Sequence, residues 1–351
     1  MNSHDSSRHT LQSVDTLQAI AVQSLARWGI ICRDIRLLKH RENAVFKIVS
    51  DNGNTYALRV HRDSYHSDAE LHSELQWMHA LQSAGVDVPI VVPALDGSLF
   101  VHAAPEEGAR TLQVDLFEWI DGAQLGTSEG GLGHDVQNIE HIYRTIGGIA
   151  ARLHNQSSQW APPTGFTRHA WDRDGLVGPN PFWGRFWELE ALTPAQRSLM
   201  IRAREIVDTE LSEMERAPDH QDNFGLIHAD FVPENLLVDQ GVVRLLDFDD
   251  AGYGWHLFEL ATALHFIRGD QNYLIARTAL IDGYRAQRAL PDSALEKLPL
   301  FQMARGFTYV GWMHTRQGMD MVREMTPVVT GLACSFAEEF VDTWGKGAGP
   351  L

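Results

Sequence analysis

The sequence predicts an α+β fold in two lobes, a small antiparallel-sheet lobe followed by a larger helical lobe. The chain has 351 residues, of which 44% are hydrophobic, which is enough for more than one core. Strand-like runs separated by turns fill its first third, and helical apolar spacing dominates after a glycine-rich stretch. We expect the sheet lobe over residues 1–117, a hinge over 118–122 and the helical lobe over 123–351.

Turns and apolar periodicity predict the elements of the first lobe. Residues 14–28 have helical spacing and end at Gly29. An Asp-Asn-Gly-Asn turn at 51–54 indicates a hairpin. A helix over residues 67–84, closed by Gly85, follows the hairpin. The expected strands cover 35–39, 44–49, 55–61, 91–93, 99–102 and 111–119.

The second lobe begins with a glycine-rich stretch at residues 122–133. This stretch lacks the G-x-G-x-x-G spacing of a nucleotide-binding loop, so we expect a connector. An apolar stripe from Ile139 to Leu153 predicts the first long helix. Strands are expected at 236–238 and 242–246, on either side of a Gln-Gly turn. Further helices are expected over 195–216, 256–268, 272–288 and, with breaks, 295–343.

Charge and hydropathy limit the classes of binding partner and the location expected for the protein. The net charge of -17, with no run of Lys or Arg, argues against a nucleic-acid partner and is compatible with a cationic substrate. No apolar stretch reaches 18 residues, so we expect no membrane span. The polar segment Met1–Thr10 and the distant Cys32 and Cys334 favour a cytoplasmic protein without a disulfide framework. Nothing in the sequence indicates an oligomeric state.

The candidate catalytic residues lie in one short region of the sequence. This region is the run His228-Ala-Asp230-Phe-Val-Pro-Glu-Asn235, followed by Asp247. Phosphoryl transfer from ATP needs positioning, charge neutralisation and a carboxylate near the attacking hydroxyl. Asp230 begins a loop after an apolar strand, and Asn235 lies where it can face a metal. Asp247 follows the next hairpin, and such hard oxygen ligands suit Mg²⁺. The pattern predicts an ATP- and Mg²⁺-dependent phosphotransferase with Asp230, Asn235 and Asp247 as catalytic residues.

These motifs resemble those of the aminoglycoside phosphotransferase and choline kinase superfamily, which has a bilobal protein-kinase-like fold. Within that superfamily, homoserine kinase type II and the bacterial stress-response kinases are closer look-alikes. The resemblance covers about residues 15–340. It implies that Asp230 is the catalytic base, that Asn235 and Asp247 are metal ligands, and that His228 holds the catalytic loop.

The resemblance extends to a nucleotide side in the first lobe. Tyr56-Ala57-Leu58-Arg59 occupies the place of the kinase Val-Ala-Ile-Lys strand, with arginine in place of lysine. Arg59 is therefore expected to touch the ATP phosphates, with Lys47 as a rival. Glu74 resembles the helix glutamate that pairs with this cation, and Glu70 competes for that role.

Two further segments complete the expected nucleotide site. The turn Arg41–Phe46 has no glycine, and Asn43 is expected to help cover the phosphates. Backbone groups of Glu118 and Ile120 are expected to bond the adenine edge, because an edge strand leaves such groups free.

Glu259 stands where related families have an aspartate that braces the catalytic loop, so its expected role is structural.

The expected acceptor is a hydroxyl of a small molecule, namely an amino alcohol, a hydroxy amino acid or an aminoglycoside-like compound. After Asp247 the chain goes directly to Gly252 and a helix, which favours a small acceptor over a protein. A Ser/Thr protein kinase of the stress-response type and a non-catalytic nucleotide-binding scaffold are the alternatives. Possible substrate contacts are Asp249, Asp250 and Glu234, which could equally support the metal. Trp255 is a further possible contact, although core packing is the commoner fate of an aromatic side chain.

Overall fold

The computed structural model describes residues 13–40, 43–106, 109–128, 130–133 and 138–344. The chain divides into two compact units, one of residues 1–79 and 89–120, the other of residues 80–88 and 121–351. An antiparallel sheet dominates the first unit and helices dominate the second, which confirms the predicted α+β class. The division after Ile120 falls within the segment expected to be a hinge, whereas the place of residues 80–88 was not predicted.

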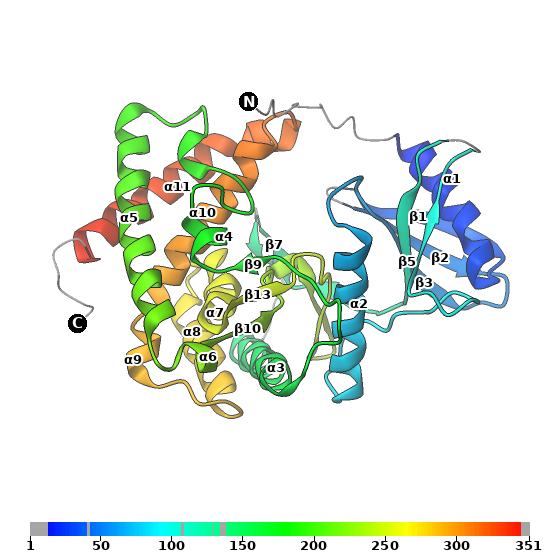
Figure 1. Cartoon of the computed structure of the whole chain (residues 1–351), viewed down its shortest axis with the longest axis horizontal. Coiled ribbons are helices and arrows are strands. Elements are labelled where there is room, and N and C mark those ends of the chain that lie inside the picture. Colours follow the sequence, from blue (N-terminus) through cyan, green and yellow to red (C-terminus); the bar gives the residue numbers. More distant parts are fainter. Residues whose placement is uncertain (1–12, 41–42, 107–108, 129, 134–137, 345–351) are drawn as a thin grey trace. The chain divides into compact units, whose positions relative to one another are not determined.

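The first unit is built on a five-stranded antiparallel sheet in the order β1-β2-β3-β5-β4 (Figure 1). Strict alternation on β2 buries Phe46 and Ile48 in a core that also takes Leu17 and Ile20 from α1. The elements of this unit are α1 (Val14–Ser24), η1 (Leu25–Trp28), β1 (Cys32–His40), β2 (Ala44–Ser50), β3 (Thr55–Val60), α2 (Asp68–Ser83, ending among residues of the second unit), β4 (Phe100–Ala103) and β5 (Leu112–Glu118).

Local chemistry explains where these elements begin and end. The Ser13 side chain accepts a hydrogen bond from the Thr16 N–H and so caps α1. The expected strand at 91–93 is wrong, because only a single bridge from Val91 to Phe117 forms there. The segment lies between Pro89 and Pro93, which have no N–H to give to a strand ladder.

The second unit is mainly helical, with small sheets ordered β10-β13-β9, β12-β11-β6 and β7-β8 (Figure 1). Helices α3 and α8 pack together where a Cβ on Gly147 would lie 2.0 Å from the Leu280 carbonyl oxygen. The elements are β6 (Ala123–Gln124), β7 (Gly126–Thr127), β8 (Gly131–Leu132), α3 (Ile139–Gln159), β9 (Ala170–Trp171), α4 (Arg173–Val177), η2 (Phe186–Glu188), α5 (Pro194–Arg216), α6 (His220–Asn223), β10 (Phe224–Ile227), η3 (Pro233–Asn235), β11 (Leu236–Asp239), β12 (Val242–Leu245), β13 (Gly252–Trp255), α7 (His256–His265), α8 (Tyr273–Arg285), α9 (Asp292–Leu295), α10 (Leu298–Thr315) and α11 (Asp320–Trp344).

The glycine-rich stretch is more ordered than a simple connector. Its strands β7 and β8 form a short antiparallel hairpin. A Cβ on Gly126 would lie 1.9 Å from the Gly131 carbonyl oxygen, so this close backbone approach requires glycine. Among the described residues, no helix combines the length and apolar character needed to cross a membrane.

Candidate active site

The loop that carries Asp230 is shaped by the elements on either side of it. Strand β10 pairs antiparallel with β13 up to Ile227, which fixes where the loop begins. Ala229 then adopts a left-handed conformation with φ of 65°, which is uncommon for a residue with a side chain. Pro233, at the first position of η3, starts the turn that ends with Asn235.

Two donors hold the carboxylate of Asp230, one on each oxygen. Asn235 donates from Nδ2 to Oδ2 at 2.7 Å, and Arg305 of α10 donates from Nη2 to Oδ1 at 2.9 Å. The Arg305 side chain is only 2% exposed, whereas that of Asp230 is 18% exposed. The carboxylate is therefore fixed in orientation while part of it still reaches the surface.

The same contacts bring Asp247 to the catalytic loop. Leu246 donates its N–H to the Asn235 carbonyl oxygen at 2.8 Å, and the His228 Nε2 lies 2.9 Å from the Leu246 carbonyl oxygen. Asp247 follows directly in a left-handed conformation, with φ of 64°. The structure thus places Asp230, Asn235 and Asp247 on two connected loops of the second unit.

The side-chain oxygens of Asn235 and Asp247 suit a hard divalent cation. Because the Asn235 amide nitrogen is directed at Asp230, its side-chain oxygen is the atom left for a metal. No group of three or more His, Cys, Asp or Glu in the part of the chain that the structure describes is arranged to hold a metal by itself. Sites for Mg²⁺ commonly use one or two protein oxygen ligands together with phosphates and water.

Glu259 braces the catalytic loop from α7. Its two carboxylate oxygens accept the N–H groups of His228 at 2.8 Å and of Ala229 at 2.7 Å. Burial raises the pKa of Glu259, whereas His228, the two N–H donors and Arg305 act in the opposite direction. The glutamate therefore forms the brace for which related families use an aspartate.

The backbone that follows Asp247 is held from the segment before β9. Arg168 donates to the carbonyl oxygens of Asp249 and Ala251. Trp171 donates from its indole nitrogen to the Asp250 carbonyl oxygen at 2.9 Å. Asp249 is only 6% exposed, so burial limits its access to a substrate amine.

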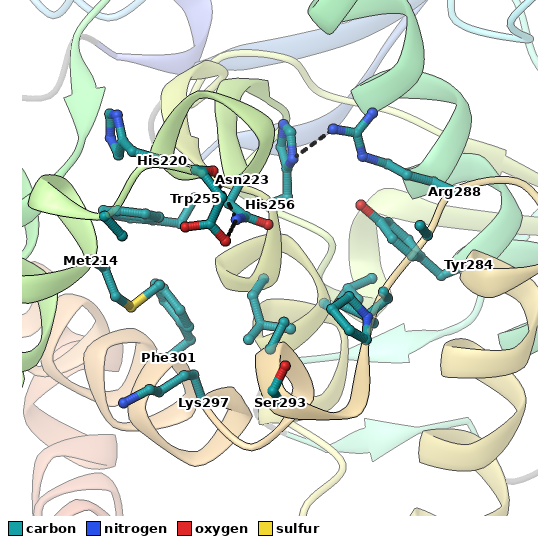
Figure 2. A pocket seen from close by; sticks show the side chains of 18 residues that line it. Met214, His220, Asn223, Trp255, His256, Tyr284, Arg288, Ser293, Lys297 and Phe301 are labelled. Atoms are coloured by element: carbon teal, nitrogen blue, oxygen red, sulfur yellow. Dashed lines mark hydrogen bonds between the residues drawn. The ribbon is translucent and has the colours of Figure 1, made fainter.

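Glu234 and Trp255 have different surroundings. Glu234 accepts hydrogen bonds from both the N–H and the hydroxyl of Ser128, at 2.6 and 2.7 Å, and so ties the loop to the β7–β8 hairpin. Trp255 is 1% exposed and packs against His220 and Phe301. It lines a pocket of about 220 Å³ that Asp230 does not line, and Figure 2 shows this pocket with Arg288 reaching His256.

A larger pocket, of about 840 Å³, lies within the second unit, and Asp230 does not line this one either. Its lining residue Ser128 bonds Glu234 of the loop. Another lining residue, Phe266, has its ring 5.7 Å from the guanidinium carbon of Arg305. The lining comprises Ser128, Gly130, Gly131, His265, Phe266, Arg268, Gly269, Asp270, Gly306, Tyr309, Glu324, Met325, Val328, Val329, Leu332, Ala333, Ser335, Phe336 and Glu339.

In the first unit, Arg59 is the centre of a buried ion-pair network. It donates to Glu74 at 2.8 Å and to both oxygens of Asp115, at 2.6 and 3.1 Å. His61 also contacts Asp115, with 3.0 Å from Nε2 to Oδ2. Burial would raise the pKa of Asp115, but Arg59 and His61 outweigh it and lower that pKa to about 2.

The rivals to Arg59 and Glu74 are engaged elsewhere. The Glu70 carboxylate accepts the N–H and hydroxyl of Ser67 at the start of α2. Lys47 lies over the Trp119 ring, 4.1 Å from its centroid. Asn43 accepts the Arg62 N–H at 3.0 Å, and residues 41–42 of the expected phosphate-covering turn lie outside the described residues.

The expectation that Glu118 offers a free edge is wrong. Strand β5 lies between β3 and β4 and is not an edge strand. The Glu118 N–H donates to the Ile90 carbonyl oxygen at 2.9 Å, because the segment after Pro89 runs alongside β5. For Ile120, no backbone hydrogen bond occurs among the described residues, so the contact expected for its backbone stays a prediction.

Sequence reasoning missed Arg305, Asp115 and Arg168. A signal exists for the first two, because each is a charged residue inside an otherwise apolar run of a helix or strand. Charged side chains are rarely buried without a partner, so such a position indicates an internal ion pair. Arg168 lies outside the regular elements, and nothing in its sequence context distinguishes it.

Comparison with known proteins agrees with this geometry. The family model of the phosphotransferase enzyme family (APH) matches residues 34–294. An amicoumacin kinase of Bacillus subtilis (strain 168) is 23% identical over 318 residues, which cover 88% of each chain. A homoserine kinase of Rhodospirillum rubrum is 24% identical over 296 residues, which cover 82% of this chain and 83% of that protein.

Solved structures show the same fold. A microcompartment-associated aminopropanol kinase superposes with a TM-score of 0.80 at 31% identity, covering 93% of this chain and 98% of that one. An amicoumacin kinase in complex with AMP-PNP, Ca²⁺ and Ami superposes with a TM-score of 0.72 at 19% identity, covering 93% of each chain. With a kinase-like loop of His228, Asp230 and Asn235 already in place, the chain belongs to the phosphotransferase enzyme family and is a kinase-like phosphotransferase of the small-molecule type.

Proposed function

We propose that this enzyme transfers the γ-phosphoryl group of Mg²⁺-ATP to a hydroxyl of a small amine-bearing molecule, with Asp230 as the base. The observation that carries the proposal is the Asp230 carboxylate, held by Asn235 and Arg305 on a loop tied to the residue before Asp247. Fixed orientation of the base and the metal ligands is what phosphoryl transfer demands of a protein.

The proposed step needs no covalent enzyme intermediate. The acceptor oxygen attacks the γ-phosphorus, and the bond from that phosphorus to the bridging oxygen of ADP breaks. The hydroxyl proton passes to Asp230. The hydrogen bonds from Arg305 and Asn235 fix the direction of the carboxylate that receives this proton.

We propose that Asn235 and Asp247 hold the metal and that Arg59, paired with Glu74, binds the phosphates. When bound, Mg²⁺ would neutralise the charge on the phosphate oxygens. The donor set of an amide oxygen and a carboxylate supports a hard cation of this kind. An amicoumacin kinase that binds AMP-PNP and Ca²⁺ has the same fold, which supports a divalent metal here.

The 840 Å³ pocket is the proposed acceptor site. Carboxylates of Asp270, Glu324 and Glu339 outnumber the arginine, Arg268, among its described lining residues. Arg268 pairs with Glu339 at 2.8 Å, which leaves the excess of negative charge on the other two carboxylates. An ammonium group fits this excess, and the ring of Phe266 offers an apolar face. The aminopropanol kinase relative supports an amino alcohol as the acceptor class.

The segment after Asp247 supports a small acceptor over a protein. Strand β13 begins at Gly252 and α7 begins at His256, so the chain has little room for a protein-kinase activation segment. The intact set of Asp230, Asn235 and Asp247 argues against a non-catalytic scaffold.

The test is a screen of hydroxyl compounds scored by ADP release, comparing the wild type with Asp230→Asn. The compounds include aminopropanol, homoserine and amicoumacin, which the names of the relatives suggest. We expect at least one amine-bearing compound to accelerate ADP release, and Asp230→Asn to lower kcat by about 10²- to 10⁴-fold. An Asp230→Asn enzyme that turns over its acceptor at the wild-type rate contradicts the proposal.

A further inference from the structure

Arg305 is a charged residue in the apolar centre of α10. Its neighbours on the helix, Met303, Ala304 and Phe307, are fully buried. The arginine itself is 1% exposed, with its guanidinium carbon 5.0 Å from the Trp183 ring centroid and 5.7 Å from that of Phe266. Removing a charge from water is costly unless a partner and hydrogen bonds offset the loss, so this position requires an explanation.

The partner of Arg305 is the catalytic loop. Its Nη2 donates to the Asp230 Oδ1 at 2.9 Å, and its Nη1 lies 3.5 Å from the Ala229 carbonyl oxygen. Among the described residues, its Nε has no hydrogen-bond partner. The guanidinium is therefore directed at the loop rather than at its own helix or at the surface.

Arg305 and Asn235 each donate a hydrogen bond to a different oxygen of the Asp230 carboxylate. Asn235 holds Oδ2 from within the loop, and Arg305 holds Oδ1 from a helix distant in the sequence. The two rings beside Arg305 limit the conformations of its long side chain.

We propose that Arg305 is a positioning residue for phosphoryl transfer, which holds the Asp230 carboxylate directed at the acceptor hydroxyl. The inference rests on the proposed function, because it assigns to Arg305 no role except through Asp230. It predicts that loss of Arg305 lowers kcat while the binding of Mg²⁺-ATP stays as it was. Arg305 is assigned no contact with the nucleotide.

The experiment is a double-mutant cycle of Arg305→Gln and Asp230→Asn, with Arg305→Lys as the conservative variant. The rate is ADP release with the acceptor found in the screen, or with water as the acceptor. We expect Arg305→Gln to lower kcat by about 10²-fold, as small misplacements of a reacting group do, with KM for Mg²⁺-ATP changed less than about twofold. Arg305→Lys keeps the charge but lacks the planar fork, so about a tenfold loss is expected.

The cycle separates positioning from general support of the fold. If Arg305 acts through Asp230, Arg305→Gln changes the rate of the Asp230→Asn enzyme by no more than about threefold. The matched control is Arg204→Met, which removes another arginine that donates to a backbone carbonyl, that of Val177, and lies over a tryptophan ring, that of Trp187. This control should retain the wild-type kcat.

Each outcome decides between the two proposals. An Arg305→Gln enzyme with wild-type kcat overturns the inference while Asp230→Asn still tests the proposed function. Equal losses from Arg305→Gln in both backgrounds also overturn it, because they show that Arg305 acts independently of Asp230. If Arg305→Gln does not fold, the test passes to Arg305→Lys, which lacks the planar guanidinium. A wild-type kcat of the folded Arg305→Lys enzyme then overturns the inference, because the guanidinium would not be needed to position Asp230. A wild-type rate for Asp230→Asn overturns the proposed function itself.

Discussion

At the scale of single residues, ionic side chains are held by partners that lie far away in the sequence. Arg305 reaches Asp230 from α10, and Asp115 reaches Arg59 from β5. Both arginines are almost completely buried, so Arg305 depends on Asp230 for compensation, and Arg59 depends on Asp115 and Glu74. Breaking such a pair by removing one partner leaves a buried charge, which costs far more than the loss of a surface ion pair.

The pair of Arg59 and Asp115 gives a prediction for stability. Asp115→Asn should lower the unfolding free energy at pH 7 by about 3 kcal/mol, because Arg59 loses a fully buried counterion. In the folded wild-type protein, the pKa of the Asp115 carboxyl is lowered from 3.8 to about 2. The ionised carboxylate therefore stabilises the fold above about pH 4, and this contribution is lost as the pH falls toward 2.

Urea unfolding of wild type and variant at pH 7, 5 and 3 measures this difference. The gap in unfolding free energy should be largest at pH 7 and 5 and smaller at pH 3. Asp63→Asn is the control, because Asp63 pairs with the exposed Arg110 and should change stability by less than about 1 kcal/mol. A gap for Asp115→Asn that grows as the pH falls would contradict the assignment.

At the scale of elements, the structure shows which contacts of the site can be predicted from the sequence. Asp230 and Asn235 belong to one short loop, so their spacing alone predicts that they lie together. Arg305 comes from α10, and Asp115 comes from a strand whose neighbours depend on the order β3-β5-β4. Long-range pairing of this kind depends on how elements pack, which local periodicity does not encode.

The α7 brace gives the first prediction at this scale. Glu259→Gln replaces one acceptor with an amide donor, so one of the His228 and Ala229 N–H groups loses its partner. We expect a loss of about 1 to 3 kcal/mol in unfolding free energy, as for a buried unsatisfied group, together with a lower kcat. Hydrogen exchange of the Ala229 amide should accelerate.

Glu259→Asp is the companion variant for that brace. It keeps both acceptor oxygens on a side chain one bond shorter and should retain more activity than Glu259→Gln. Unchanged exchange and kcat in the Glu259→Gln enzyme would show that the brace does not hold the loop.

The contact of α3 with α8 gives the second prediction. A Cβ on Gly147 would lie 2.0 Å from the Leu280 carbonyl oxygen, and backbone cannot move aside as a side chain can. Gly147→Ala should lower the unfolding free energy by about 2 kcal/mol or more through overpacking. At Gly148 the nearest atom is the end of the Gln287 side chain, 3.4 Å away, so Gly148→Ala should be neutral or stabilising.

Denaturant unfolding of the two alanine variants compares them directly. The two positions are adjacent on α3, so helix propensity affects both equally. Equal stability of the two variants would mean that α3 and α8 do not approach as closely as described.

At the scale of the whole molecule, the net charge of -17 bears on both substrates. A cationic acceptor is attracted by this charge, and the anionic nucleotide is repelled by it. Salt weakens both effects, because the screening length is only about 10 Å at 0.1 M. Opposite salt responses are therefore expected of the two substrates.

Steady-state kinetics at 20 and 300 mM KCl tests this expectation. KM for an amine-bearing acceptor should rise several-fold, whereas KM for Mg²⁺-ATP should fall or stay constant. A hydroxyl acceptor without an amine serves as the control and should show little change. An acceptor KM that is independent of salt would contradict a cationic acceptor.

The double anchorage of Arg59 has a consequence for control of the enzyme. In protein kinases, activity depends on whether a helix glutamate reaches the phosphate-binding lysine, so helix movement switches the enzyme on and off. Here Asp115 holds Arg59 from the sheet with two hydrogen bonds that do not involve α2. Displacing Glu74 would leave the guanidinium in place, so α2 is poorly suited to act as an off switch.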